Sequence, residues 1–261
     1  MRKFAVFGDP IAHSISPRLH NLAISALNLD AFYGRVHLTD AKKLESTFNA
    51  LNLSGANITV PHKEVAFEIC DQIDDYAQNI GSINTIVKRD EKFLGFNTDA
   101  PGFMRSVAKF GEINSALIIG AGGTARALAF ALKKSGIKVQ IVNRSAQKAQ
   151  NFIGYDFFDW SNFSPNSYDL VINSTSAGLK DENLPLPKEI LSEVFSASKF
   201  AFDVIYGRNT PFLELAEHFS LATKDGSEML LNQAVLAFDK FFDGKFDLKI
   251  VENAMKIAFT L

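Results

Sequence analysis

The sequence has almost no cysteine, no long apolar run and no dominant charge sign. Cys70 is the single cysteine among 261 residues, which excludes an intramolecular disulfide and a cysteine-based metal site. No stretch approaches the roughly 18 apolar residues of a membrane span. Lys and Arg total 27 against 29 Asp and Glu, so the formal charge is only −2. Because such a chain has no overall field to attract nucleic acid or an anionic membrane, we expect neither as a partner.

The amino terminus also lacks the features of a secretory leader. Its sequence is MRKFAVFGDP, in which four apolar residues precede Gly8 and Asp9. That run is too short for the core of a signal peptide. A single cysteine also suits a reducing compartment. We therefore expect a cytoplasmic protein.

Short apolar runs alternate with amphipathic helical stretches along the whole chain. This alternation is typical of an α/β fold with largely parallel strands, and the length favours two domains or one large unit. In the first half we expect strands near 3–8, 31–36 and 55–60, helices near 16–27 and 40–51, and a helix opened by Pro61. Ser16 is the expected N-cap of the first helix, with Pro17 at its first position. Residues 83–99 predict two antiparallel strands joined by a turn at 90–92.

Residues 115–145 predict a complete strand, glycine loop, helix and strand. Gly120, Gly122 and Gly123 follow an apolar strand and precede an alanine-rich helix, which gives the glycine pattern its meaning. Glycines let the backbone approach a pyrophosphate, and the helix amides and dipole favour phosphate binding. We expect the helix to run from Thr124 to Gly136, a residue suited to the left-handed C′ position.

The second strand of this unit does not end in the acid that NAD-binding units usually carry about 20 residues after the glycines. It ends instead in Asn143, Arg144 and Ser145, with Lys148 one helical turn further on. An acid would repel a 2′-phosphate, whereas a guanidinium makes charge-assisted hydrogen bonds to it. The sequence therefore predicts NADP as the cofactor.

The first hundred residues place polar side chains at three expected strand ends. These pairs are Ser14 with Ser16, Thr59 with Lys63, and Asn84 with Asp99. Each residue alone fits a cap, a turn or an exposed position. Together, in the half opposite a dinucleotide unit, they predict a substrate pocket with a proton donor. Elementary chemistry also nominates Arg18 as a clamp for a substrate carboxylate.

At this point the chain resembles the shikimate dehydrogenase family. The resemblance rests on motifs that span almost the whole chain in family order: GDPIAHSISPRLHN, NITVPHK, GSINTI, GFNTDAPGF, GAGGTARA, VNRS, DVIYGRNTPFL and DGSEMLLNQAVLAF. It implies reversible NADPH-dependent reduction of 3-dehydroshikimate to shikimate in aromatic amino-acid biosynthesis, without a metal.

The resemblance also implies a role for particular residues. Lys63 and Asp99 match the catalytic pair, and Ser14 and Ser16 match the serines that bind the substrate carboxylate, in place of Arg18. Further substrate contacts match Thr59, Asn84, Tyr206 and Gln233. The cofactor positions match Gly120, Ala121, Gly122, Gly123, Thr124, Asn143, Arg144, Lys148, Thr175, Val204 and Gly226.

These roles imply a division of the chain into two domains. We expect a mostly parallel α/β substrate domain at 1–101 and 233–261, and a Rossmann-type NADP-binding domain at 102–232. The carboxyl-terminal helices return to the first domain, because Gln233 must reach the substrate. The oligomeric state stays open between monomer and homodimer.

Three other functions remain open on this scaffold. One is a quinate/shikimate dehydrogenase using NAD, which Arg144 disfavours. Another is a catalytically silent NADP-binding regulator, which the retained Lys63 and Asp99 disfavour. A third is a methylenetetrahydrofolate-type dehydrogenase, which Ser14, Ser16 and the motif NTD disfavour.

Overall fold

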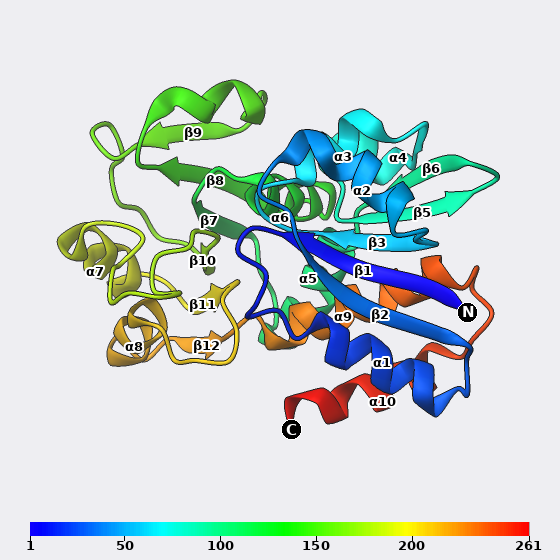
Figure 1. Cartoon of the computed structure of the whole chain (residues 1–261). Coiled ribbons are helices and arrows are strands. Elements are labelled where there is room, and N and C mark those ends of the chain that lie inside the picture. The colour runs from blue at the N-terminus through cyan, green and yellow to red at the C-terminus, as the bar shows by residue number, and fades with distance from the viewer. Residues whose placement is uncertain (261) are drawn as a thin grey trace. The chain divides into compact units, whose positions relative to one another are not determined.

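The computed structural model describes residues 1–260 and divides the chain into two compact units. The first unit comprises Met1–Gly102 and the segment that begins at Leu231; the second comprises Phe103–Leu230. Each unit contains a six-stranded sheet with helices packed against it (Figure 1). The predicted two-domain α/β fold, with carboxyl-terminal helices that belong to the first domain, is confirmed. No helix within residues 1–260 is long and apolar enough to cross a membrane.

The sheet of the first unit has the strand order β2-β1-β3-β5-β6-β4. Its strands are β1 Arg2–Gly8, β2 Ala31–His37, β3 Gly55–Ile58, β4 Gln72–Ile73, β5 Thr85–Arg89 and β6 Lys92–Phe96. Its helices are α1 Ser16–Ala26, η1 Ala41–Lys43, α2 Leu44–Ala50, α3 Lys63–Ile69, α4 Asp75–Ile80, the start of α5 Asp99–Val107, most of α9 Ser227–Phe241, α10 Leu248–Lys256 and η4 Ile257–Phe259. β5 runs antiparallel to β3 and β6, and the remaining pairs are parallel.

Helices cover both faces of this sheet. On one face Phe7, Ile58 and Ile86 pack with Phe48 of α2 and Ala66 of α3 in one apolar cluster. The residues between them in the strands point to the opposite face, because side chains alternate along a strand. There the helices are α1, α9 and α10, and α1 packs against α10 (Figure 1).

His20 of α1 is buried on this second face. Its ring is stacked on Tyr33 of β2, with centroids 4.2 Å apart and an interplanar angle of 2°. Neither ring nitrogen has a hydrogen-bond partner among residues 1–260. Burial therefore lowers the pKa of His20 from 6.5 to about 3, since the charged form loses its solvation.

This burial makes stability depend on pH. Below pH 6.5 the unfolded chain binds a proton at His20 that the folded chain does not, so stability falls as pH decreases towards 3. Because of this residue, we expect the free energy of unfolding to be about 2 kcal/mol lower at pH 5 than at pH 7. His20→Phe, which keeps an aromatic ring, is expected to flatten the acid limb in urea titrations. The exposed His218→Gln is the control, and an unchanged acid limb in His20→Phe would contradict the prediction.

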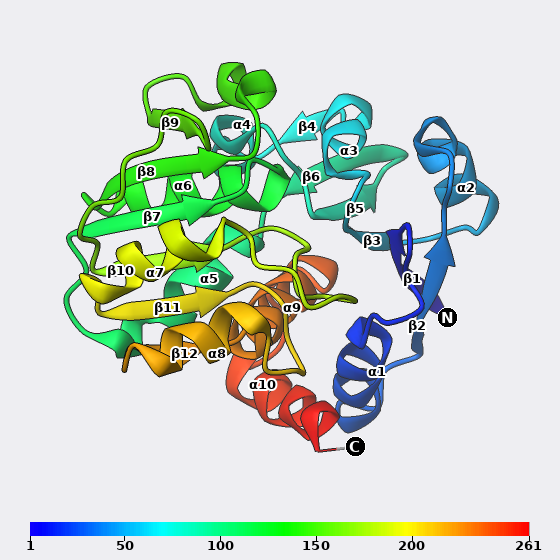
Figure 2. The same ribbon diagram turned by 90° about the vertical axis from the view of Figure 1, so that its left-hand side faces the viewer.

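The second unit is a parallel sheet with the order β12-β11-β10-β7-β8-β9. Its strands are β7 Ser115–Ile119, β8 Lys138–Asn143, β9 Asp156–Asp159, β10 Leu170–Asn173, β11 Phe200–Asp203 and β12 Ala222–Lys224. Its helices are the end of α5, η2 Ala108–Phe110, α6 Gly123–Lys134, η3 Ala146–Phe152, α7 Lys188–Ser196, α8 Pro211–His218 and the start of α9. Taken along the chain, this order is the doubly wound 3-2-1-4-5-6 arrangement of dinucleotide-binding folds (Figure 2).

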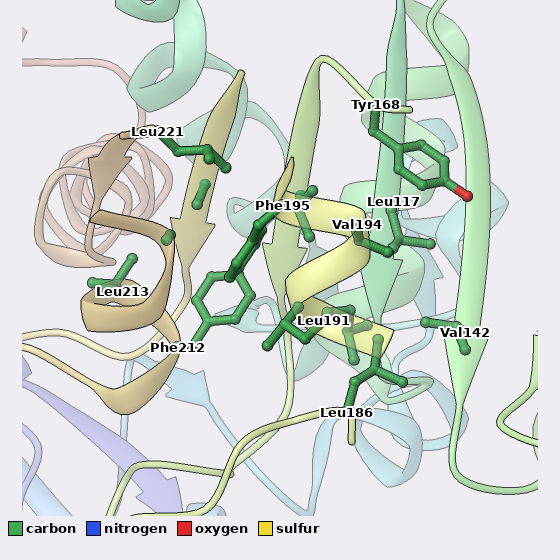
Figure 3. Packing of buried hydrophobic residues seen from close by; sticks show 14 of the residues in the cluster. Leu117, Val142, Tyr168, Leu186, Leu191, Val194, Phe195, Phe212, Leu213 and Leu221 are labelled. Carbon is green, nitrogen blue, oxygen red and sulfur yellow. The ribbon is translucent and has the colours of Figure 1, made fainter. Parts of the chain in front are cut away.

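An apolar core holds α7 and α8 on one face of this sheet. Leu117 of β7 and Val142 of β8 meet Leu191 and Phe195 of α7 and Phe212 of α8 (Figure 3). Phe195 and Phe212 are arranged edge to face, with centroids 5.3 Å apart. α6 packs on β7 and β8 and contributes no residue to this cluster, so it covers the other face. This core packs α7 and α8 against the strands whose carboxyl ends lead to the predicted cofactor residues.

Two local expectations were wrong. Ser16 is not the N-cap of α1, because Ile15 occupies that position and Ser16 is the first helical residue. Pro61 does not open α3, which begins at Lys63 with His62 at the N-cap. In both places a residue at the start of the helix is buried and hydrogen-bonded outside it: the Ser16 hydroxyl to Ser14, and the His62 ring to the Leu38 carbonyl. The strand β4 and the helix α4 were not expected.

Candidate active and cofactor sites

The predicted substrate residues of the first unit gather at one edge of its sheet. The parallel strands β1, β3 and β6 end at this edge, and Ser14, Lys63 and Asp99 follow them. Because β5 runs in the opposite direction, it begins at the same edge, immediately after Asn84. A single antiparallel strand thus brings Asn84 to the carboxyl ends of its parallel neighbours, where open α/β sheets bind ligands.

Lys63 and Asp99 form a buried ion pair. Lys63 Nζ donates to Asp99 Oδ2 at 2.5 Å, and the two residues are 8% and 7% exposed. Both lie at the first position of a helix, Lys63 on α3 and Asp99 on α5. A helix dipole disfavours an ammonium at that position, and the carboxylate offsets this cost. The pair therefore holds a proton-bearing group and its charged partner together in a largely desolvated place.

Asn84 holds the other oxygen of Asp99. Its Nδ2 donates to Asp99 Oδ1 at 2.8 Å and lies 3.4 Å from Gln233 Oε1 of α9. α9 passes so close to α5 here that a Cβ on Gly102 would lie 2.8 Å from the Gln233 backbone nitrogen. Four of the predicted site residues, Lys63, Asn84, Asp99 and Gln233, are thus brought into one connected cluster.

Ser14 and Ser16 lie in the segment between β1 and α1 and are both buried. Ser14 Oγ is 3.2 Å from Ser16 Oγ and accepts the Ser16 backbone N–H at 3.3 Å. Arg35 of β2, which sequence reasoning missed, donates to the Ser14 carbonyl at 2.6 and 2.9 Å. Arg18 instead donates to the Ala258 carbonyl at 3.1 Å. The Arg35 guanidinium therefore holds the segment that carries Ser14 and Ser16 through the Ser14 backbone carbonyl.

Thr59 and Tyr206 each follow the end of a strand. Thr59 follows β3 and its backbone N–H donates to the Phe7 carbonyl at 2.9 Å; its methyl group packs on Gly8. A Cβ on Gly8 would lie 2.5 Å from that methyl carbon, so Gly8 is required by close packing. Tyr206 is half-buried and belongs to the second unit, after β11.

The glycine loop connects β7 to α6. Gly120 has φ +113°, and a Cβ there would lie 2.7 Å from Ser174 Oγ and 2.9 Å from Thr175 Cγ2. Gly122 is the N-cap of α6, has no positive φ, and a Cβ added there would meet no atom within 4 Å. Packing therefore requires glycine at 120, whereas at 122 glycine leaves open space beside the backbone N–H groups that begin α6.

A pocket of about 660 Å³ opens beside this loop, where the strand order reverses between β7 and β10. Four predicted cofactor residues line it: Gly120, Asn143, Arg144 and Thr175. Asn143 Nδ2 donates to the Ser145 carbonyl at 2.9 Å, and Thr175 Oγ1 donates to Asn173 Oδ1 at 2.7 Å. Arg144 is exposed at the pocket and has no acid as an ion-pair partner within residues 1–260.

Other residues of the pocket were not found from the sequence. They include Trp160, Asp181 and Glu182. Glu182 is paired with Arg208 at 2.9 Å. Asp181 accepts the Gly178 N–H at 2.9 Å, and this bond holds the pKa of the Asp181 carboxyl below its usual value. Both carboxylates, which line the pocket together with Arg144, are therefore engaged within the protein. In the sequence they belong only to a loop rich in acids, which does not predict a position in a cofactor pocket.

The remaining predicted cofactor residues do not line the pocket. Ala121 and Thr124 belong to the glycine loop and the first turn of α6, and Lys148 is exposed on η3. Gly226 packs directly on Val204, so that a Cβ on Gly226 would overlap the Val204 carbonyl oxygen. The Gly226 N–H also donates to the Ile205 carbonyl at 2.9 Å. The structure thus places Val204 and Gly226 together and leaves Lys148 outside the pocket.

One unit has the Rossmann-type strand order and a glycine loop, and the other buries a lysine–carboxylate pair. Together these features are typical of a two-domain, dinucleotide-dependent oxidoreductase. Two family models match the chain: the shikimate dehydrogenase substrate binding domain over residues 6–86, and shikimate / quinate 5-dehydrogenase over residues 106–180. The chain belongs to the shikimate dehydrogenase family.

Individual relatives extend this similarity to nearly full length. Shikimate dehydrogenase (NADP(+)) of Helicobacter hepaticus is 48% identical over 248 residues, covering 94% of this chain and 92% of that protein. The enzyme of the same name from Helicobacter pylori strain J99 is 42% identical over 271 residues, covering 99% of each. A crystal structure of shikimate 5-dehydrogenase from Thermus thermophilus, in complex with NADP(H) and shikimate, has a TM-score of 0.84. It is 34% identical and covers 99% of this chain and 100% of that one.

Proposed function

We propose that this protein catalyses the reversible NADPH-dependent reduction of 3-dehydroshikimate to shikimate in aromatic amino-acid biosynthesis. The observation that carries the proposal is the buried Lys63–Asp99 pair, joined to Asn84 and Gln233 at the ligand-binding edge of the sheet. The family membership and the relatives named for shikimate and NADP(+) support it.

The residues of the second unit fit a dinucleotide. The open space at Gly122 admits a pyrophosphate to the first amides of α6, and packing gives no other reason for glycine there. Arg144 supplies a guanidinium for the 2′-phosphate. NADPH supplies the hydride when bound. Around it we assign Ala121, Gly123, Thr124, Asn143, Thr175, Val204 and Gly226 to the cofactor, with Lys148 as a longer-range positive charge.

The residues of the first unit then supply substrate binding and the proton. Lys63 gives a proton to the oxygen of the carbonyl that is reduced, or recovers it in the reverse direction. Asp99 orients Lys63 and accepts hydrogen bonds from substrate hydroxyls, and the side-chain amides of Asn84 and Gln233 make further hydrogen bonds to these hydroxyls. Ser14 and Ser16 bind the substrate carboxylate through their hydroxyl groups, and Thr59 and Tyr206 contribute further substrate contacts.

The proposed domains are 1–101 with 233–261 for substrate, and 102–232 for NADP. A cytoplasmic location and a monomeric or homodimeric state also stay predictions. The match to the shikimate / quinate 5-dehydrogenase family supports a second candidate activity, some oxidation of quinate. A purely regulatory NADP-binding role is disfavoured, because such a role does not require the buried Lys63–Asp99 pair.

One assay separates these functions. NADPH oxidation is followed by its absorbance with purified protein and 3-dehydroshikimate, in parallel with NADP⁺ or NAD⁺ reduction with shikimate and with quinate. We expect turnover of 3-dehydroshikimate and shikimate with the phosphorylated cofactor to exceed every other combination. No turnover of 3-dehydroshikimate, with NADP⁺ binding intact, would favour the regulatory role. Faster turnover of quinate with NAD⁺ would favour the quinate enzyme.

Ser14→Ala tests the proposed carboxylate site. We expect shikimate to bind roughly ten- to 150-fold more weakly, because one hydrogen bond to a charged group, worth about 1.5 to 3 kcal/mol, is lost. NADP⁺ affinity is expected to be unchanged. The Ser14 hydroxyl makes only long bonds of 3.2 and 3.3 Å within residues 1–260, so the melting temperature should fall little. Calorimetric titration with shikimate measures this. A large loss of stability with unchanged shikimate binding would make Ser14 a turn residue instead.

A further inference from the structure

A chain of buried hydrogen bonds leads away from Asp99 into the sheet. Asn57 of β3 and Thr85 of β5 are direct partners across the antiparallel pair, and Asn57 Nδ2 donates to Thr85 Oγ1 at 3.0 Å. Tyr33 Oη of β2 donates to Asn57 Oδ1 at 2.6 Å. Thr85 Oγ1 donates to Asn84 Oδ1 at 3.0 Å. All four residues are nearly inaccessible, with exposures between 0% and 6%.

The donor and the acceptor of each hydrogen bond in this series can be assigned. Burial raises the pKa of Tyr33 well above its ordinary value, so its hydroxyl stays protonated and donates. Asn57 Nδ2 also donates to the Asn84 carbonyl at 3.3 Å, and a flipped Asn57 amide would set an oxygen against that carbonyl. Asn57 therefore presents its oxygen to Tyr33 and its nitrogen to Thr85. The Thr85 hydroxyl, which accepts from Asn57, donates its single proton to Asn84 Oδ1 at 3.0 Å, a closer acceptor than Thr98 Oγ1 at 3.4 Å.

The same logic orients Asn84. Its Oδ1 accepts from Thr85 and from the Thr98 backbone N–H at 2.8 Å, so its Nδ2 must face Asp99. A flipped Asn84 would place its oxygen against Asp99 Oδ1 and its NH₂ group against two donors. Asp99 is thereby held on Oδ1 by a neutral amide and on Oδ2 by Lys63, the charged group that contacts it within residues 1–260.

We propose that Asn57 and Thr85, with Tyr33 as the first donor, are positioning residues for the reaction: their hydrogen-bond chain orients Asn84, and Asn84 orients Asp99 towards Lys63. This inference rests on the proposed function for its kinetic consequence. Its structural consequence, the fixed orientation of the Asn84 amide, does not depend on it. Hydrogen bonds in such chains polarise one another, so loss of one link weakens the next.

Thr85→Val and Thr85→Ser form the central test. Valine keeps the shape of threonine without the hydroxyl, and serine keeps the hydroxyl. We expect kcat for shikimate oxidation to fall about three- to tenfold in Thr85→Val, the range of one hydrogen bond, and to recover most of that loss in Thr85→Ser. NADP⁺ affinity is expected to be unchanged in both. Equal losses in the two variants, or wild-type kcat in Thr85→Val, would overturn the inference.

A second readout needs no activity. The side-chain amide signal of Asn84, assigned in ¹⁵N spectra by its loss in Asn84→Asp, is expected to shift and to exchange faster with solvent in Thr85→Val. Ser82→Ala is the matched control, because the Ser82 hydroxyl is fully buried and has no hydrogen-bond partner within residues 1–260. It should leave both kcat and the Asn84 signal unchanged. An Asn84 signal that is unaffected in Thr85→Val would overturn the inference.

Failure of the proposed function, and failure of Thr85→Val to fold, can each be distinguished from failure of this inference. If the wild-type protein does not reduce 3-dehydroshikimate, the proposed function fails, while the Asn84 signal still decides whether the chain orients that amide. If Thr85→Val does not fold, Tyr33→Phe carries the same test, since it deletes only the hydroxyl at the far end of the chain. A shifted Asn84 signal with about twofold lower kcat would then support the inference. An unshifted signal would refute it.

Discussion

Lys63→Ala is expected to lower kcat by about 10² to 10⁴, the usual contribution of general acid–base catalysis. The structure gives the physical reason, because Lys63 is buried at the start of α3 and its ammonium is held by Asp99 at 2.5 Å. Alanine removes the proton and leaves the carboxylate without its charged partner. Steady-state kinetics with shikimate and NADP⁺ measure the effect. NADP⁺ affinity is expected to change little, since the nucleotide residues belong to the second unit.

Two further variants separate proton transfer from charge alone. Lys63→Arg keeps the charge but scarcely releases its proton, so it should restore little activity. Asp99→Asn should impair both turnover and shikimate binding, because Asp99 orients Lys63 and faces the proposed substrate site. The exposed Lys92→Ala on β6 is the matched control and should behave as wild type. Near-normal turnover in Lys63→Ala, with a normal melting temperature, would assign Lys63 a structural role.

Arg144→Ala is expected to remove most of the preference for NADP(H) over NAD(H). Each charged hydrogen bond to the 2′-phosphate contributes about 1.5 to 3 kcal/mol, which corresponds to roughly ten- to 150-fold in affinity. Arg144 lines the pocket beside Gly120 and Thr175, and no acid among residues 1–260 pairs with it there. Fluorescence titrations with NADP⁺ and NAD⁺ measure the change. NAD⁺ affinity should stay nearly constant, because that cofactor has no 2′-phosphate.

Lys148→Ala is the comparison for this prediction. Lys148 is exposed on η3 and does not line the pocket, so we expect a smaller loss that disappears at high salt. Equal affinity of the unmodified protein for the two cofactors would contradict the assignment of Arg144. A loss of similar size in Lys148→Ala would show that the overall positive charge, rather than a directed guanidinium contact, recognises the phosphate.

Local patterns in the sequence were sufficient for much of the fold. The alternation of apolar runs and helical stretches predicted two α/β units, and the residues around Gly120 predicted β7, α6 and β8 nearly to their ends. Gly136 takes the left-handed conformation expected at the end of α6, with φ +80°. These features depend on residues that are neighbours in the chain. Each of these features can therefore be predicted from one short segment of the sequence.

The helix starts at Ser16 and Pro61 were less predictable, because contacts outside the helix influence them. Ser16 has the chemistry of an N-cap, yet its hydroxyl interacts with Ser14 and the helix begins one residue earlier than expected. After Pro61, the His62 ring forms a hydrogen bond with the Leu38 carbonyl at 2.6 Å, and this distant contact helps to fix where α3 begins. Capping preferences of about 1 kcal/mol are readily outweighed by such buried contacts.

By itself, the sequence determined which residue types stand at the strand ends: hydroxyls at 14 and 16, an amine at 63, an amide at 84 and a carboxylate at 99. Only the tertiary structure decided that they lie at one edge of the sheet, and that Lys63, Asn84 and Asp99 are hydrogen-bonded there. The reversed direction of β5 brings Asn84 to the edge where β3 and β6 end, and the return of α9 adds Gln233. Asn57 and Arg35 had no signal of their own, because Thr85 lies 28 residues from Asn57, and Ser14 lies 21 residues from Arg35. Hydrogen bonding between side chains depends on distance in space, and pairing across a sheet sets that distance independently of separation along the chain.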